Sequence, residues 1–136
     1  FGSIMNEIIK AALNEEKVLK IFGNNFKTKD GTTERDFIHI DDLLNAHIKS
    51  LTFLQNFKGY DVFNVGTGRA ISILDLLLKF IKYNDVKLKY EFSKKKNKDI
   101  QTSYSNVEKI NSTFNWKSIK TIKDMVRDSW QPYSNQ

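Results

Sequence analysis

Cysteine is absent from the 136-residue chain, and histidine occurs only twice. The lack of cysteine excludes a disulfide framework, a thiolate nucleophile and a cysteine-ligated zinc site. Two histidines are too few for a histidine-rich metal centre. The longest apolar run, residues 76–81, is interrupted by Lys79 and is far shorter than the roughly 20 residues of a membrane-spanning helix. A cysteine-free chain suits a reducing compartment, so we expect a cytoplasmic protein.

Arginine is also scarce, because most of the 22 basic residues are lysines. The 16 acidic residues leave a net charge of +6. A lysine excess supports nucleic-acid binding only weakly, and it would equally suit a small ligand that carries phosphate. With 40% hydrophobic and 28% charged residues, the composition indicates one ordinary globular domain over residues 1–136.

The periodicity of the apolar residues indicates an α/β chain. Helical spacing predicts helices over residues 3–14, 41–54, 72–81, 106–114 and 121–130. Short apolar or alternating runs predict strands over residues 18–22, 37–40, 61–65 and 88–92. Strands interleaved with helices are typical of α/β folds, but there are too few strands here for a complete doubly wound sheet.

Two helix starts carry a strong local signal. Ser72 precedes an apolar helical face and is followed three residues later by Asp75, and Thr121 stands in the same relation to Asp124. A hydroxyl side chain at the N-cap with an acidic residue three positions on resembles a capping box. We therefore expect these two residues to begin their helices.

Two motifs suggest nicotinamide-dinucleotide chemistry but fail on context. In the Gly66-Thr67-Gly68 turn the position of a third glycine is taken by the β-branched Ile71, which would keep the helix from approaching the strand. The pair Tyr83 and Lys87 has the Tyr-x-x-x-Lys spacing, but the intervening Asn84-Asp85 favours a helix exit and would put the two on different elements. We expect a tight turn and an accidental pair.

Several segments together resemble a known family. They are Leu19-Lys20-Ile21-Phe22-Gly23-Asn24, Asp30-Gly31-Thr32, Arg35-Asp36-Phe37-Ile38-His39-Ile40-Asp41-Asp42-Leu43, Phe63-Asn64-Val65-Gly66-Thr67-Gly68 and Asn115-Trp116. In this order the segments resemble the carboxyl-terminal region of the NAD-dependent sugar-nucleotide epimerases and dehydratases. These enzymes belong to the extended short-chain dehydrogenase/reductase family, and the resemblance is strongest to its UDP-glucose 4-epimerase group.

The resemblance implies a division of labour between two parts of a parent enzyme. In this family an amino-terminal Rossmann domain binds NAD and carries the catalytic Tyr-x-x-x-Lys, and neither is expected in this chain. The chain is then the substrate-binding portion of an enzyme that interconverts UDP-glucose and UDP-galactose, with NAD bound by the missing Rossmann domain. It should be inactive alone.

The resemblance also implies roles for individual residues near the nucleotide. Arg35 matches an arginine that contacts the diphosphate, where a planar guanidinium suits paired phosphate oxygens; an ion pair with Glu34 or Asp36 is the alternative. Lys20, Ile21 and Phe22 match a strand that receives the uracil, and they can serve as a core strand at the same time.

Four more positions carry implied substrate contacts. Ile73 matches a residue beside the nucleotide, although an ordinary core role fits equally well. Lys96 replaces a phosphate-binding arginine, and Asp99 matches an aspartate that accepts from the ribose; a solvated lysine loop is the alternative. Ser103 stands where some relatives have a bulky tyrosine, so its small side chain predicts room for an N-acetyl group on the sugar.

The sequence is also compatible with other functions. A related dehydratase or reductase would share the same carboxyl-terminal fold. A standalone basic nucleotide-binding module is a second alternative, with nucleic acid an improbable partner because aromatic residues are not interleaved with the lysines. We further expect the chain to self-associate or to rearrange so that apolar surface around Ile4 and Ile8 is covered, and we expect His39 to be structural.

Overall fold

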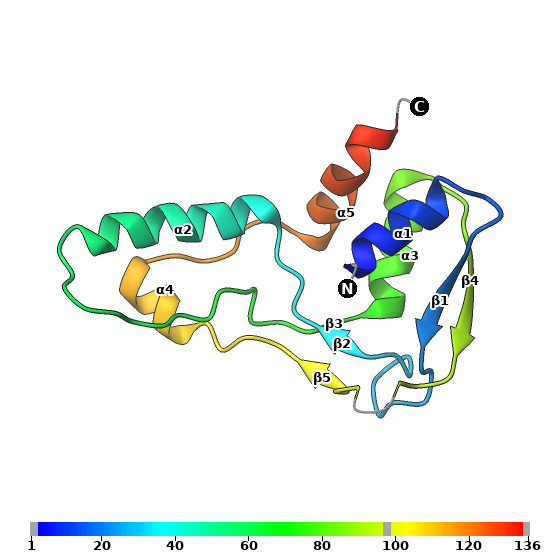
Figure 1. The fold of residues 1–136 in the computed structure, drawn as a ribbon, viewed down its shortest axis with the longest axis horizontal. Coiled ribbons are helices and arrows are strands. Elements are labelled where there is room, and N and C mark those ends of the chain that lie inside the picture. Colours follow the sequence, from blue (N-terminus) through cyan, green and yellow to red (C-terminus); the bar gives the residue numbers. More distant parts are fainter. Residues whose placement is uncertain (1–2, 97–98, 135–136) are drawn as a thin grey trace.

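The fold is an elongated arrangement of short strands and helices (Figure 1). The computed structural model describes residues 3–96 and 99–134. In chain order the elements are α1 (Ile4–Ala12), β1 (Val18–Phe22), β2 (Glu34–Arg35), α2 (Ile40–Leu54), β3 (Ile71–Ser72), α3 (Ile73–Asn84), β4 (Lys89–Ser93), β5 (Thr102–Ser103), α4 (Glu108–Phe114), α5 (Ile122–Trp130) and the 3-10 turn η1 (Gln131–Tyr133). The expected α/β class is confirmed.

The strands form two small sheets. β1 and β4 pair in parallel from Val18 opposite Lys89 to Phe22 opposite Ser93. In the other sheet the two-residue β2 lies between β3, to which it is antiparallel, and β5, to which it is parallel. This second sheet brings the start of α3 beside Arg35, and it therefore positions residues from three distant parts of the sequence.

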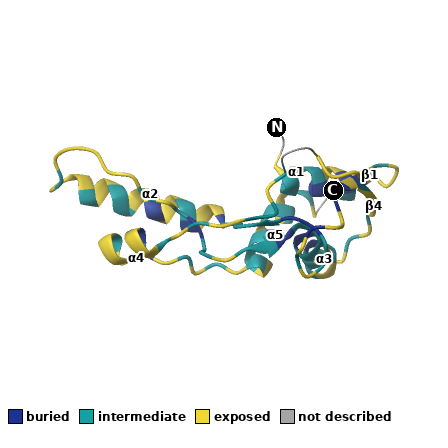
Figure 2. Ribbon diagram, turned by 90° about the horizontal axis from the view of Figure 1, so that it is seen from below, coloured by how far each residue is buried: buried dark blue, intermediate teal, exposed yellow. Residues whose placement is uncertain are grey.

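The larger core lies where α1, α3 and α5 pack near β1 (Figure 2). Its buried side chains are Ile8, Ile9, Ala11, Leu19, Ile21, Leu76, Leu77, Phe80 and Val126. Ile8 is completely buried within the chain, so it is not part of an exposed apolar surface. It packs on the apolar faces of the helices that the same chain supplies.

A second, smaller core joins α2 to α4. Ala46, Ile110 and Trp116 are its buried residues. Beside them the rings of Phe63 and Phe114 lie 4.6 Å apart, in a cluster that Phe53 extends. The chain thus has two hydrophobic centres, with α2 and α4 lying at the opposite end of the molecule from β1 and β4 (Figure 1).

The helices follow the sequence pattern closely because their starting signals are local. The Ser72 side chain accepts from the backbone N–H of Asp75 at 3.0 Å, although the Asp75 carboxylate pairs with Lys79 instead of completing a capping box. At α5 the capping box is complete, with Thr121 and Asp124 each accepting from the other's backbone. Both predicted helix starts are confirmed.

Two of the four predicted strands are wrong, because a strand also requires a pairing partner from another part of the chain. Residues 37–39 are irregular and Ile40 already belongs to α2, whereas the short β2 lies just before them. Residues 61–65 are strand-like in sequence, but they also have no assigned structure. A strand exists only where a neighbouring strand supplies hydrogen bonds, and no described segment pairs with either stretch.

The remaining strand predictions hold with small changes. β1 has the predicted bounds, and β4 begins one residue later than expected. On β4, Tyr90 and Phe92 are 38% and 43% exposed. Within the described residues, β4 pairs with β1 alone.

The Tyr83 and Lys87 pair is separated as expected. Helix α3 ends at Asn84, and Asp85 follows in the left-handed conformation with φ of 50°. Tyr83 therefore lies on the helix and Lys87 beyond it. In the part of the chain that is described, none of the helices combines the length and apolar character that spanning a bilayer requires.

Candidate functional site

A pocket of about 270 Å³ lies among β1, β2, the start of α3 and the segment that follows β4. It is lined by Ile4, Lys20, Ile21, Phe22, Thr33, Arg35, Phe37, Ile73, Lys96 and Asp99. Seven of the eight residues for which the family resemblance implied substrate contact therefore surround one pocket. They come from four separate stretches of sequence, which the structure brings together.

Arg35 is held on the pocket wall by backbone oxygens. Its Nη1 donates to the carbonyl of Glu34 at 2.7 Å and, more weakly, to that of Gln101 at 3.4 Å. Within the described residues no carboxylate lies within ion-pair distance of the guanidinium. The half-buried Arg35 thus keeps a positive charge that its surroundings orient but do not neutralise.

The two acidic neighbours of Arg35 are engaged elsewhere, which argues against the alternative ion-pair interpretation. Glu34 accepts from the Thr102 hydroxyl at 2.9 Å. Asp36 accepts from the backbone N–H groups of Thr67 at 2.9 Å, Gly68 at 3.1 Å and Ser105 at 3.2 Å. A free cation on a pocket wall is suited to an anionic ligand.

Asp36 is a structural residue that the sequence reasoning missed. Its carboxylate also accepts from the Thr67 hydroxyl at 2.6 Å, so it collects donors from the turn at residues 66–68 and from Ser105. A side chain at Gly66 would collide with this carboxylate. The presence of both an acidic residue and a Gly-Thr-Gly turn could have indicated this role, because such turns expose several backbone N–H groups that a carboxylate can accept from.

This arrangement also decides what the Gly-Thr-Gly turn can bind. A dinucleotide fingerprint works by offering free backbone N–H groups to a pyrophosphate. Here the N–H groups of Thr67 and Gly68 already donate to Asp36. The turn is therefore bound internally by Asp36, and its residues do not fit NAD.

Two lysines in the segment that follows β4 pack on aromatic rings. The Lys96 ammonium lies 3.9 Å from the centroid of the Phe22 ring, and the Lys95 ammonium lies 4.2 Å from that of Phe26. Such contacts orient a cation that would otherwise be mobile. Lys20, by contrast, makes only an exposed ion pair with Glu91 at 3.8 Å, which holds it weakly.

Ser103 is the one implied contact residue outside this pocket. It lines a neighbouring hollow of about 300 Å³ that Arg35 also borders. The two residues are paired across β2 and β5. Arg35 thus lies between the two hollows, and Ser103 is exposed beside it.

Asp30 fixes the start of α3 next to Ile73. Its carboxylate accepts from the Ser72 hydroxyl and from the backbone and hydroxyl of Thr32, at 2.9 Å and 2.7 Å for the latter two. Burial alone would raise the pKa of Asp30, but the hydrogen bonds from Ser72 and Thr32 outweigh it, so the pKa lies below its ordinary value of 3.8.

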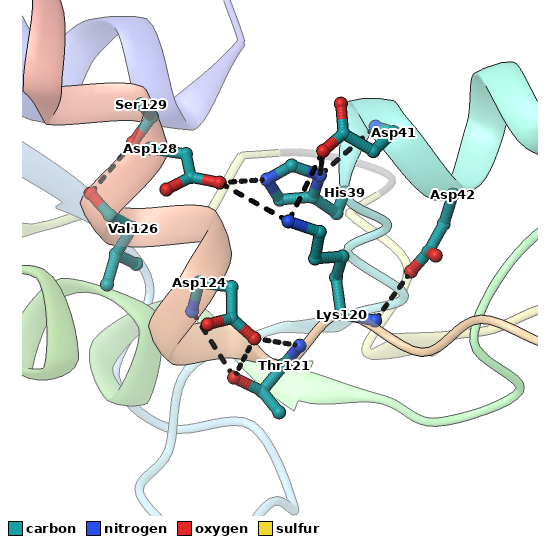
Figure 3. Close-up of polar contacts among 9 residues, drawn as sticks. All are labelled: His39, Asp41, Asp42, Lys120, Thr121, Asp124, Val126, Asp128 and Ser129. Carbon is teal, nitrogen blue, oxygen red and sulfur yellow. Dashed lines mark hydrogen bonds and ion pairs between the residues drawn. The ribbon is translucent and has the colours of Figure 1, made fainter.

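His39 joins the two halves of the molecule away from the pocket (Figure 3). It is 5% exposed, its Nδ1 accepts from the Asp41 backbone at 3.1 Å, and its Nε2 lies 3.1 Å from the Asp128 carboxylate on α5. The ammonium of Lys120 lies 3.3 Å from Asp41 and 3.8 Å from Asp128. These contacts hold the His39 ring through both nitrogens and join α2 to α5, which agrees with the expected structural role of His39.

Comparisons with known proteins relate the chain to sugar-nucleotide enzymes. The sequence model of the NAD dependent epimerase/dehydratase family matches residues 2–66. The UDP-glucose 4-epimerase of Bacillus subtilis is 33% identical over 96% of this chain, and UDP-glucose 4-epimerase 2 of Arabidopsis thaliana is 34% identical over 98%. The match spans only 38% and 39% of those two relatives, so the chain covers about two fifths of their length.

Solved structures give the same relationship. The UDP-glucose 4-epimerase of Stenotrophomonas maltophila, with bound NAD and formylated UDP-arabinopyranose, superposes with a TM-score of 0.92 at 28% identity, covering 99% of this chain and 40% of that one. The enzyme of Bifidobacterium longum, in complex with NAD⁺ and UDP, gives 0.84 at 28% identity, covering 98% and 40%. Over nearly its whole length the chain is therefore similar to about two fifths of the UDP-glucose 4-epimerases, and it shares the fold of that part of their solved structures.

Proposed function

We propose that this chain binds the UDP-sugar of an NAD-dependent 4-epimerase that interconverts UDP-glucose and UDP-galactose. The convergence of Lys20, Phe22, Arg35, Lys96 and Asp99 on one pocket is the observation that carries the proposal. Relatives with this fold have been solved with UDP or a UDP-sugar bound, and three cations on the pocket suit a diphosphate.

The chemistry of the pocket suggests a division of tasks among these residues. Arg35 would hold the diphosphate, because its guanidinium is oriented by two carbonyls and lacks a carboxylate partner. Lys96 would add a second positive charge to the pocket wall. The apolar surface of Ile21 and Phe22 would receive the uracil, with Asp99 accepting from the ribose hydroxyls.

The redox chemistry would come from a part of the epimerase fold outside the matched two fifths. NAD supplies reversible hydride transfer when it is bound there, and the residues of this chain do not fit NAD because the donors of the Gly-Thr-Gly turn are engaged by Asp36. The contribution of this chain is then to bind and orient the nucleotide. At about 270 Å³ the pocket is slightly smaller than typical ligand sites, which measure about 300–1,000 Å³; such a size suits one wall of a shared site.

Ser103 would set how large a sugar the site accepts. It borders the hollow next to Arg35, on the side where a sugar attached to the diphosphate would extend. Since serine is small, we propose that N-acetylated UDP-hexoses also bind.

Titration calorimetry of the full chain tests this function. We expect UDP-glucose and UDP to bind, and Arg35→Gln to weaken both about tenfold or more, because a hydrogen bond to a charged group contributes about 1.5–3 kcal/mol. Arg69→Gln is the matched control: it removes the same charge from an exposed arginine outside the pocket, and we expect it to have little effect.

Two comparisons separate specific recognition from general attraction to charge. Uridine lacks the diphosphate, so the affinity for uridine should be the same in Arg35→Gln as in the wild type. Equal losses in the Arg35 and Arg69 variants, or equal affinities for UDP-glucose and inorganic pyrophosphate, would contradict the proposal.

A further inference from the structure

Lys96 contributes a positive charge to the pocket, and its ammonium packs on an aromatic ring. The ammonium lies 3.9 Å from the centroid of the Phe22 ring, well inside the roughly 6 Å over which an aromatic face attracts a cation. Within the described residues Lys96 forms no ion pair with a carboxylate. Since a lysine ammonium is a point charge on a flexible stem, it needs a contact of this kind to keep a fixed direction.

Phe22 is itself a rigid support for that contact. It is the last residue of β1, where it pairs with Ser93 of β4 (Figure 1), and the N–H of the following Gly23 donates to the Ser93 carbonyl at 2.8 Å. Gly23 adopts a φ of 81°, and a Cβ there would lie 2.5 Å from the Phe26 ring, so the chain beyond β1 is closely packed. Phe22 is 38% exposed and can therefore offer a face of its ring to a cation.

The other two cations of the pocket show why this support matters. Arg35 is oriented by two carbonyl oxygens, whereas Lys20 is in an exposed ion pair with Glu91. An exposed pair of this kind holds a lysine only weakly. Arg35 and Lys96 are therefore the two cations that the structure holds firmly on the pocket wall, and together they suit a ligand with two adjacent phosphate groups.

We propose that Phe22 is a positioning residue for Lys96: the face of its ring holds the ammonium where it meets the diphosphate of a UDP-sugar. This inference rests on the proposed function and deepens it, because it assigns the ring to the diphosphate half of the ligand. The face that Lys96 covers cannot also stack on a base. The uracil then needs only apolar surface at this position, which an aliphatic side chain would also supply.

Titration calorimetry of the full chain with UDP and with uridine tests this role. Phe22→Leu keeps an apolar side chain but has no π face, and it should weaken UDP binding about two- to fivefold, the size of a partly exposed cation–π contact. Uridine lacks the diphosphate, so its affinity should not change. Phe22→Tyr, which keeps a π face, should bind UDP as tightly as the wild type.

A double-variant cycle shows whether Phe22 acts through Lys96. Lys96→Gln removes the ammonium and should weaken UDP binding, and adding Phe22→Leu to it should cause no further loss. Lys95→Gln is the matched control, because the Lys95 ammonium lies 4.2 Å from the Phe26 ring and neither residue lines the pocket. Phe92→Leu removes a ring that is 43% exposed from the neighbouring strand. We expect both controls to bind UDP as the wild type does.

The contact itself can be measured without any ligand. In NMR spectra of the free chain, the Phe22 ring current should shift the ε-methylene protons of Lys96 upfield. The shift should disappear in Phe22→Leu and remain in Phe22→Tyr. A wild-type chain that binds no UDP would refute the proposed function, and the Lys96 shift would then decide by itself whether Phe22 positions this lysine.

Four results would overturn the inference. Two of them are a Lys96 shift that is the same in the wild type and in Phe22→Leu, and an unchanged UDP affinity in Phe22→Leu. The third is an equal loss of UDP and uridine affinity in Phe22→Leu, which would identify the ring as a stacking surface for the uracil. The fourth is a loss from Phe22→Leu that is the same with and without the Lys96 ammonium.

Discussion

Asp30 shows how a single carboxylate couples the pocket to stability. It ties the loop before β2 to Ser72, the N-cap of the helix that begins at Ile73, and to Thr32. The ionised form is the better acceptor for these three hydrogen bonds, which is why they lower its pKa despite partial burial.

The pH dependence of unfolding should report this carboxylate. Because the folded-state pKa of Asp30 is lowered from 3.8, its contribution is fully present above about pH 4 and is lost as pH falls through the lowered value. We expect Asp30→Asn to destabilise the chain near pH 7 and to flatten the decline below pH 4, as measured by urea unfolding between pH 3 and pH 7. Asp85→Asn, at an exposed acidic position, serves as control; curves for Asp30→Asn and the wild type that stay parallel would refute the assignment.

At the same scale, the candidate site was predictable only in part. The residues of the pocket were identified through family resemblance, since nothing in the local sequence near Lys96 or Ile73 indicates that they meet. The role of Asp36 was missed because its partners, Thr67 and Ser105, lie more than thirty residues away. Local sequence shows which side chains can bind an anion, but the fold decides which of them are already engaged.

Among the elements, α5 depends most clearly on its first turn. Thr121 and Asp124 form a complete capping box, and Val126 one turn later is fully buried against the larger core. The cap therefore sets the position at which α5 begins to pack on α3.

Removing this cap should cost measurable stability. We expect Thr121→Ala to lower the free energy of unfolding by about 1 kcal/mol, the usual value for an N-cap, as measured by urea denaturation. Thr113→Ala is the control, because Thr113 is an exposed helical threonine outside any cap. A similar loss in both variants would mean that the effect is not capping.

Helices and strands differed in how well sequence predicted them. The starts at Ser72 and Thr121 were correct because a cap is a bond between residues three apart. Residues 61–65 have a strand pattern but no strand, since pairing requires a partner that sequence periodicity cannot supply. The apolar pattern there is explained instead by Phe63 and Val65, which pack on the smaller core.

Across the whole molecule, the His39 cluster links α2 to α5. Because Nδ1 accepts from the Asp41 backbone, the ring proton of neutral His39 lies on Nε2 and is donated to Asp128. Asp42 adds a second link by accepting from the backbone N–H groups of Ile119 and Lys120. The two cores are thereby held by polar contacts between distant segments.

We expect His39→Ala to weaken this link. The loss of the N-cap and of the bond to Asp128 should lower the free energy of unfolding by about 2 kcal/mol and speed amide exchange in the first turn of α2. His47→Ala removes the other histidine, which is exposed and bonds only within α2, and it should change stability by less than about 0.5 kcal/mol. Unchanged exchange in His39→Ala would show that the cluster does not join the halves.

The parallel pairing of β1 with β4 has a consequence for the synthesis of the chain on the ribosome. Val18 pairs with Lys89, so the two partners are 71 positions apart in the sequence. At translation rates of about 5–20 residues per second, β1 emerges roughly 4–14 s before its partner exists. During that interval Leu19 and Ile21, which end almost fully buried, have no native strand beside them, and a holding chaperone has its longest opportunity to bind there.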